Sequence, residues 1–181
     1  MTGMGECWEY ILKNENEDSK LIGLDFSSEM LKRAKQKKLE YSNSNIELLK
    51  ENVFDNSIES ESADYVISGF GLKTFNEEQL AKFANEINRI LKPNGKFSLI
   101  EVSVPKIKIL KLFYMFYVKK IIPILGKMFL GSPETYKMLG IYTEKFGNSK
   151  NVYKIFEKGN FEVEYVEYFF GCATGIKGVK K

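Results

Sequence analysis

The sequence of 181 residues contains no histidine, two cysteines and one tryptophan. Histidine is the commonest general base and a frequent metal ligand, so we expect no metal site and expect other groups to move protons. Cys7 and Cys172 are far apart in the chain and form no CxxC motif, which favours reduced thiols and a cytoplasmic protein. The first residues are polar and glycine-rich and do not resemble a signal peptide.

Charges of the two signs nearly balance, because the formal net charge is only +3. No arginine-rich or aromatic-interleaved basic stripe is present, so we expect no nucleic-acid partner. Hydrophobic residues make up 44% of the chain and aromatic residues 14%, which is enough for an ordinary core and excludes a disordered chain. We predict a single domain over residues 1–181, with a helical insert at about 105–147.

Strand-like and helix-like patterns alternate along the chain. Residues 27–41 and 76–92 have amphipathic helical spacing, with Ser27 or Ser28 and Asn76 as expected N-caps. A further helix is expected to end at Gly159. Strands are predicted at 20–26, 45–52, 63–71, 96–104, 161–169 and 172–179, with Tyr65, Val66 and Ile67 as a buried run. The pattern predicts an α/β fold with a mostly parallel sheet and an antiparallel closing pair, because only a short turn at Gly171 separates the last two strands.

Two glycines near the start are followed by an acid at the end of the first predicted strand. Gly3-Met4-Gly5 forms a turn, and Asp25 can accept hydrogen bonds from the two hydroxyls of a ribose. Trp8 occupies the place of the third glycine of a dinucleotide fingerprint, which favours a nucleoside ligand without a pyrophosphate. An ordinary turn beside a solvated Asp25 is the alternative.

Several segments resemble one enzyme family. They are "GLDFSSEML", "ADYVISGFGLKTF", "EINRILKPNGKFSLIEVSVP" and "GCATGIKGVK", and they are similar to the ubiquinone/menaquinone-biosynthesis C-methyltransferases. "FGLK" and "EVSVP" resemble that family's FGLR and EFSKP signatures, and the spacing from Pro105 through Pro123, Gly126, Tyr136 and Leu139 resembles its LPxxG and YxYL pattern. The resemblance covers Thr2–Lys180. It implies a Rossmann-like class I fold, S-adenosylmethionine as cofactor, and C-methylation of a quinol or phenolic precursor in menaquinone or ubiquinone biosynthesis.

The resemblance also implies an N-terminal truncation. In the family, a strand that ends in an acid precedes the glycine loop, whereas this chain starts inside the loop. We therefore expect the first strand to be missing, and its place to lie between the strands that end at Asp25 and Ser68. Such a sheet would leave backbone groups unpaired.

Residue by residue, the resemblance implies a cofactor site. Its positions are Gly3, Met4 and Gly5 around the methionine part, Asp25 at the ribose, Phe26 beside the adenine, Asn52 and Val53 at the adenine edge, and Gly69 after the next strand. For Asn52, a turn asparagine is the alternative.

For catalysis, the resemblance points to Lys73 and Tyr136. Lys73 matches the arginine of FGLR and is expected to hold a phenolate, although an ammonium lacks the bidentate fork. Thr74 and Ile176 stand where the family has asparagine and histidine. The alternatives are a solvated loop lysine at 73 and a packing residue at 136.

The insert leaves two interpretations open. Pro123 and the lysines interrupt it too often for a membrane span. Its apolar residues can line a tunnel for a prenylated quinol tail while its lysines face anionic lipid, which implies peripheral contact at the inner face of the membrane. The alternative is core packing with a homodimer contact. The apolar residues are Leu110, Phe113, Tyr114, Phe116, Tyr117 and Ile121, and the lysines are Lys108, Lys111, Lys119 and Lys120.

Other functions also stay open. A methyltransferase for another small phenolic or lipid acceptor has the same motifs, since acceptor choice rarely shows in one sequence. An inactive truncated remnant or an interaction module is the alternative of a different class.

Overall fold

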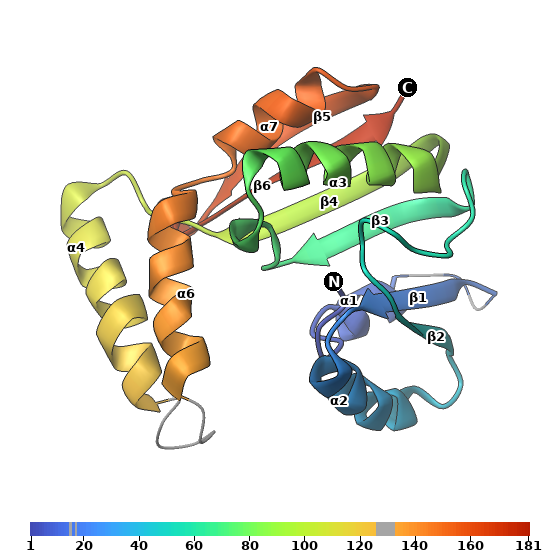
Figure 1. The fold of residues 1–181 in the computed structure, drawn as a ribbon, viewed down its shortest axis with the longest axis horizontal. Coiled ribbons are helices and arrows are strands. Elements are labelled where there is room, and N and C mark those ends of the chain that lie inside the picture. The colour runs from blue at the N-terminus through green and yellow to red at the C-terminus, as the bar shows by residue number, and fades with distance from the viewer. Residues whose placement is uncertain (15, 17, 126–132) are drawn as a thin grey trace. The chain divides into compact units, whose positions relative to one another are not determined.

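A computed structural model describes residues 1–14, 16, 18–125 and 133–181, without the side chains of 133–137. The chain forms two compact units, Met1–Ser62 and Ala63–Lys181 (Figure 1). Among the described helices, none has the length and apolar character needed to cross a bilayer.

The first unit contains a two-stranded parallel sheet. Its elements are α1 (Trp8–Leu12), β1 (Lys20–Asp25), α2 (Ser28–Lys38), the short helix η1 (Leu39–Tyr41) and β2 (Asn45–Lys50). The ladder runs from Lys20 opposite Asn45 to Asp25 opposite Lys50, so both strands end at the same edge. Ser27 is the N-cap of α2, because its side chain accepts a hydrogen bond from the Met30 N–H. Four buried side chains form the core of this unit: Trp8, Leu21, Ala34 and Ile46.

The second unit contains a four-stranded sheet in the order β3-β4-β6-β5. Its elements are β3 (Ala63–Gly69), η2 (Leu72–Thr74), α3 (Glu77–Ile90), β4 (Leu91–Val102), α4 (Lys108–Phe116), the π-helical turn η3 (Tyr117–Ile121), α6 (Pro133–Phe146), α7 (Lys150–Glu157), β5 (Phe161–Tyr168), η4 (Phe169–Gly171) and β6 (Ala173–Lys180). β3 is parallel to β4, and β6 is antiparallel to both β4 and β5, which confirms the predicted antiparallel closing pair.

Helices α3 and α7 pack against each other and against one face of this sheet (Figure 1). Phe97 of β4 lies on that face, with its ring centroid 5.2 Å from the Phe156 ring of α7. Asn76 caps α3 in a capping box with Gln79. These contacts place the apolar core of the unit between the sheet and the two helices.

The predicted buried run in β3 is wrong for two of its three residues. Tyr65 and Ile67 are 59% and 46% exposed. Side chains alternate along a strand, and the register places Val66 beside Phe97 on the face that α3 and α7 cover. Tyr65 and Ile67 therefore point to the opposite face.

The segment "LKPNGK" also differs from its prediction. Helix α3 ends at Ile90, and β4 already starts at Leu91 instead of residue 96. The register of β3 and β4 shifts between Ala63, opposite Leu91, and Tyr65, opposite Lys96. Asn94 has a φ of +62° in this bulge.

β1 and β3 both lie at an edge of their sheets. In the described part of the chain, β1 forms a ladder with β2 and β3 with β4, and no ladder joins β1 to β3. The expected open place between these two strands stays a prediction.

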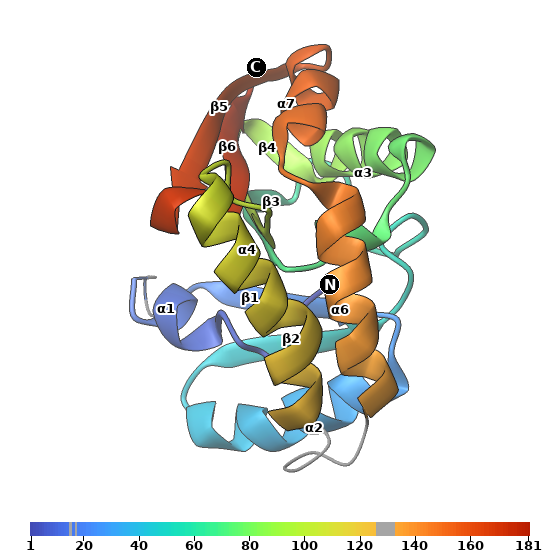
Figure 2. The same ribbon diagram turned by 90° about the vertical axis from the view of Figure 1, so that its left-hand side faces the viewer.

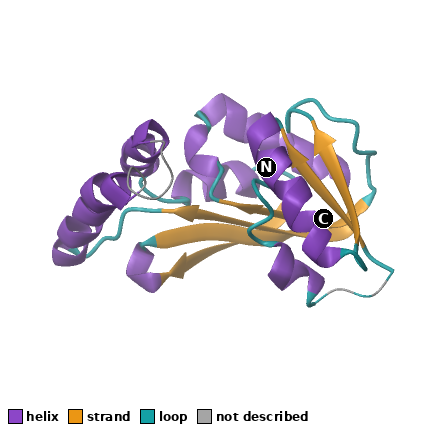
Figure 3. Ribbon diagram, turned by 90° about the horizontal axis from the view of Figure 1, so that it is seen from below, coloured by secondary structure: helices purple, strands orange, loops and turns teal. Residues whose placement is uncertain are grey.

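The helical insert leaves and rejoins the second unit at one point. The Val104 N–H donates to the Gly147 carbonyl over 2.7 Å, and the Ser103 and Thr174 hydroxyls lie 2.6 Å apart. Because β3, β4 and β5 are parallel, this point lies at the edge where all three end. Helices α4 and α6 run side by side beyond that edge (Figures 2 and 3).

Candidate functional site

The glycine turn of the first unit requires both of its glycines. Gly3 and Gly5 have φ values of +58° and +85°, where side chains are strained. A Cβ on Gly5 would lie 2.6 Å from the Trp8 ring. Trp8 is 1% exposed and donates its indole N–H to the Thr2 hydroxyl over 2.9 Å. The residue that stands in place of a third glycine thus anchors the turn on the core.

Asp25 joins this turn to the end of β1. Its Oδ2 accepts the Gly3 N–H over 2.9 Å, and its Oδ1 accepts the Ser27 N–H over 3.0 Å. The carboxylate is 8% exposed, so the alternative of a solvated Asp25 is wrong. A carboxylate offers about four acceptor positions, so each oxygen keeps one for a further donor. The structure brings the predicted Gly3 and Asp25 together.

Met4 lies between the two glycines of the turn. Its N–H donates to Glu6 Oε2 over 2.9 Å. The carbonyl of Gly5 accepts the Lys37 ammonium over 2.8 Å. Glu6 and Lys37 were not predicted as site residues, and they fix the backbone on which the predicted loop depends.

Phe26, Asn52 and Val53 follow the ends of β1 and β2. Phe26 is 76% exposed and comes directly after Asp25. Asn52 is a turn residue, because its Oδ1 accepts the Phe54 N–H over 3.1 Å and its backbone pairs with Asp55. An acid therefore ends β1, an exposed aromatic ring follows it, and an amide follows the neighbouring parallel strand β2. A hydrogen-bond acceptor, an aromatic ring and an amide suit a nucleoside, so the residues present fit the cofactor that the sequence predicts.

Lys73 of the second unit is held by a buried carboxylate. Its ammonium lies 2.9 Å from Glu101 Oε1, and its backbone N–H donates to Glu101 Oε2 over 3.0 Å. The ammonium also donates to the Phe70 carbonyl. The side chain of Lys73 is 9% exposed and that of Glu101 is fully buried, so Lys73 is not a solvated loop lysine.

Glu101 was missed as a site residue. It lies near the end of β4 within a run that periodicity predicts only as a strand, and its Oε1 also accepts the Val102 N–H over 2.7 Å. A charged residue at the buried end of a parallel strand was the available signal.

Tyr114 was predicted only as a lining residue, and it connects α4 to the sheet. Its hydroxyl donates to the Cys172 carbonyl over 3.1 Å. Burial, followed by the negative charge of Cys172 and Glu101, raises the pKa of Tyr114 to about 12. The hydroxyl therefore stays protonated at neutral pH. Of the predicted tunnel residues, Phe113, Phe116 and Tyr117 are exposed, and the tunnel itself stays a prediction.

The remaining predicted residues lie in the second unit. Gly69 is the last residue of β3 and half-buried. Tyr136 lies in α6, and its side chain is outside the described residues, as is Gly126. Helix α6 contacts η2, the turn that carries Lys73. Ile176 is buried in β6.

Comparison with known proteins agrees with the resemblance. Residues 1–180 match the model of the ubiE/COQ5 methyltransferase family. The chain is 37% identical over 171 residues to the demethylmenaquinone methyltransferase of Lactococcus lactis, with 94% of this chain and 67% of that protein covered. It is also 37% identical over 179 residues to the enzyme of that name from Oceanobacillus iheyensis, with 98% and 74% covered.

Solved structures support the fold. The crystal structure of a SAM-dependent methyltransferase from Aquifex aeolicus superposes with a TM-score of 0.67 at 21% identity, covering 99% of this chain and 79% of that one. At that identity the likeness concerns the fold alone. Together with the family match, it identifies a Rossmann-like class I fold that uses S-adenosylmethionine. The chain belongs to the ubiE/COQ5 methyltransferase family.

Proposed function

We propose that this methyltransferase transfers a methyl group from S-adenosylmethionine to a ring carbon of a demethylmenaquinol. The relatives named demethylmenaquinone methyltransferase support this acceptor, at 37% identity over nearly the whole chain. The observation that carries the proposal is the buried pair of Lys73 and Glu101, at the edge where β3 and β4 end. Ligands of open α/β sheets bind beyond that edge.

The first unit is proposed to hold the cofactor. Asp25 accepts the ribose hydroxyls through its two remaining acceptor positions, and Phe26 covers the adenine. Asn52 and Val53 contact the adenine edge, while Gly3, Met4 and Gly5 approach the methionine part. Gly69, at the end of β3 in the second unit, stays a prediction from the resemblance. Asp25 supports this assignment, because it is buried and accepts hydrogen bonds from two backbone N–H groups, which fix its geometry before the ribose binds.

Lys73 is proposed to hold the phenolate oxygen of the acceptor. A lysine ammonium has three N–H donors, and two of them point to Glu101 and to the Phe70 carbonyl. The third is available for an oxyanion. The cofactor supplies an electrophilic methyl group, so the protein needs chiefly to align the ring carbon and stabilise the phenolate. Tyr136 is proposed to contact the acceptor from α6.

Another phenolic or lipid acceptor is the second candidate. It is favoured by three departures from the family pattern, which are Lys73 for arginine, Thr74 for asparagine and Ile176 for histidine. A lysine lacks the bidentate fork of an arginine and places less constraint on the acceptor's orientation.

A lipophilic quinol also has consequences for location. We propose a cytoplasmic protein in peripheral contact with the inner face of the membrane, where such an acceptor resides. A homodimer through the exposed apolar side chains of α4 is the less favoured proposal.

Methyl transfer by the 181-residue protein tests the acceptor. The protein is incubated with S-adenosylmethionine and either reduced demethylmenaquinone or a water-soluble phenol, and the products are identified by mass spectrometry and NMR. We expect a new carbon–methyl bond on the quinol ring. A product methylated on oxygen, or methylation of the phenol alone, would contradict the proposal.

A further inference from the structure

Helix α4 and the first residue of η3 share an exposed apolar stripe, called the α4 stripe. Five side chains share the spacing i, i+3, i+4, i+7 and i+8, which places them on one face of a helix. Their exposed fractions are 72%, 69%, 67%, 58% and 47% for Ile109, Leu112, Phe113, Phe116 and Tyr117. The other side of the helix is packed, since Met115 and Val118 are buried and Tyr114 bonds to Cys172. The exposed stripe is thus not needed to hold the helix on the sheet.

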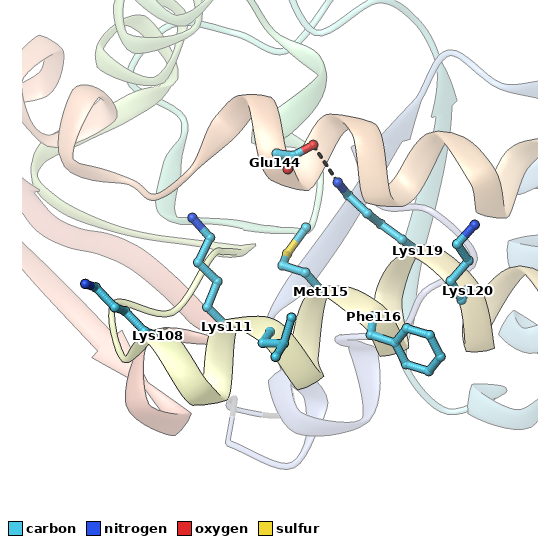
Figure 4. Close-up of a pocket in the computed structure, with 8 residues that line it drawn as sticks. Lys108, Lys111, Met115, Phe116, Lys119, Lys120 and Glu144 are labelled. Atoms are coloured by element: carbon cyan, nitrogen blue, oxygen red, sulfur yellow. Dashed lines mark hydrogen bonds and ion pairs between the residues drawn. The ribbon is translucent and has the colours of Figure 1, made fainter.

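By helical spacing, Lys108 and Lys119 lie at one border of this stripe, and Lys111 lies beyond them toward Met115. Lys108, Lys111, Lys119 and Lys120 surround a hollow of about 420 Å³ together with Leu112, Met115, Phe116 and Glu144 (Figure 4). Lys119 is ion-paired with Glu144 over 2.7 Å. The hollow therefore carries a net positive charge next to exposed apolar side chains.

A second exposed aromatic feature lies beside α4. Phe169 and Phe170 of the η4 turn are 79% and 77% exposed, and both have a positive φ. The turn adjoins the start of the insert, because a Cβ on Gly171 would lie 3.4 Å from the Pro105 Cα. Cys172, which follows the turn, accepts the Tyr114 hydrogen bond. The stripe and the two phenylalanines thus occupy the same end of the second unit.

We infer that the α4 stripe and the η4 phenylalanines dock on an anionic phospholipid bilayer, with the axis of α4 along its surface. Lysines beside Leu, Phe and Tyr on a helix are typical of interfacial binding, in which apolar side chains enter the bilayer and ammonium groups meet phosphates. A second copy is a poorer occupant, because a symmetric interface brings the same lysines together. The purpose of this docking rests on the proposed lipophilic acceptor, because docking places the enzyme where that acceptor resides.

Vesicle sedimentation of the 181-residue protein tests the charged border. We expect binding to phosphatidylcholine vesicles that contain phosphatidylglycerol, weaker binding without that lipid, and a decrease with added salt. The double variant Lys108→Gln/Lys111→Gln should lower the partition coefficient roughly 10- to 30-fold. The matched control Lys154→Gln/Lys158→Gln removes the same charge from exposed positions on and after α7 and should bind as the parent does. Equal losses in both variants would overturn the inference.

The apolar stripe has its own test. Phe113→Ser/Phe116→Ser should abolish most vesicle binding, whereas Leu39→Ser, at a 79% exposed position of the first unit, should not. Circular dichroism and cofactor affinity report whether each variant is folded. If the stripe variant changes the oligomeric state in sedimentation velocity while the parent binds no vesicles, a second copy covers the stripe and the inference is wrong.

Methyl transfer is measured separately from vesicle binding. A protein that binds anionic vesicles but methylates no quinol supports the docking surface and contradicts the proposed function. If the protein methylates the quinol but does not bind anionic vesicles, the docking surface alone is overturned.

Discussion

The ammonium of Lys73 and the carboxylate of Glu101 form a 2.9 Å ion pair between η2 and the end of β4. Three donors converge on the carboxylate, namely the Lys73 ammonium, the Lys73 N–H and the Val102 N–H. A buried pair is strongly oriented when its remaining polar atoms are also satisfied. Glu101 therefore positions Lys73.

Replacement of Lys73 tests its proposed role. Lys73→Gln removes the positive charge that holds the phenolate, so we expect kcat for methyl transfer to fall roughly 100-fold. The affinity for S-adenosylmethionine should stay unchanged. Steady-state kinetics and calorimetry measure the two quantities.

Lys73→Arg is the matched variant, since it keeps the charge and restores the residue of the family signature. We expect it to retain kcat within about tenfold of the parent, because its fork can bond to both Glu101 and an oxyanion. An unchanged kcat in Lys73→Gln would remove Lys73 from the acceptor site.

Local patterns predicted most elements of the fold. Ser27 and Asn76 cap their helices as expected, because capping depends on residues within one turn. The parallel ladders also follow from the alternation of strands and helices along the chain, and the antiparallel closing strand follows from the short turn before it. Tyr65 and Ile67 were mispredicted because periodicity cannot report whether a helix covers the second face of a sheet.

The candidate site was predicted in part. The contact of Gly3 with Asp25 follows from a recognisable turn and strand end. The contact of Lys73 with Glu101 does not, because the two residues are 28 positions apart and pair only through the side-by-side ends of β3 and β4. Long-range pairing of this kind depends on register, which the sequence pattern left open.

Asp25 is expected to control cofactor affinity. Asp25→Ala removes the charged acceptor of the ribose hydroxyls, so calorimetry should show a loss of about 1.5–3 kcal/mol, or roughly 10- to 150-fold in Kd. Asp18→Ala removes an exposed acid of the same unit and should leave Kd unchanged. Asp25→Asn keeps one oxygen for the backbone N–H groups, so it should weaken binding with a smaller loss of stability. Unaltered affinity in Asp25→Ala would exclude a ribose contact.

Gly5 should tolerate no side chain. Gly5→Ala combines a positive φ with a Cβ that would lie 2.6 Å from the Trp8 ring. We expect a loss of about 2–4 kcal/mol in the free energy of unfolding, measured in urea. Gly147→Ala is the control for the backbone alone, because Gly147 has a φ of +67° and a Cβ placed there would meet no described atom within 4 Å beyond its chain neighbours. That variant should lose only about 1–2 kcal/mol. Equal losses of unfolding free energy in the two variants would show that the Trp8 ring moves to make room for the methyl group.

Tyr114 should make stability depend on pH in the alkaline range. Its pKa is about 12 in the folded protein, against an ordinary value of 10.0, chiefly because burial disfavours the phenolate. A raised folded pKa means that the folded state keeps a proton which the unfolded chain releases. The stabilisation is therefore complete below pH 10 and is lost as the pH rises from about 10 to 12.

Urea unfolding of the parent and Tyr114→Phe measures this contribution. The variant lacks the hydrogen bond to the Cys172 carbonyl, so at pH 8 it should be less stable by about 0.5–1.5 kcal/mol. It also lacks the titrating group, so the difference between the two proteins should shrink as the pH rises from 10 to 12. Tyr10→Phe, at a 72% exposed tyrosine, is the control and should match the parent at every pH. A stability difference that is constant from pH 8 to 12 would show that the Tyr114 hydroxyl ionises in the folded protein as it does in the unfolded chain.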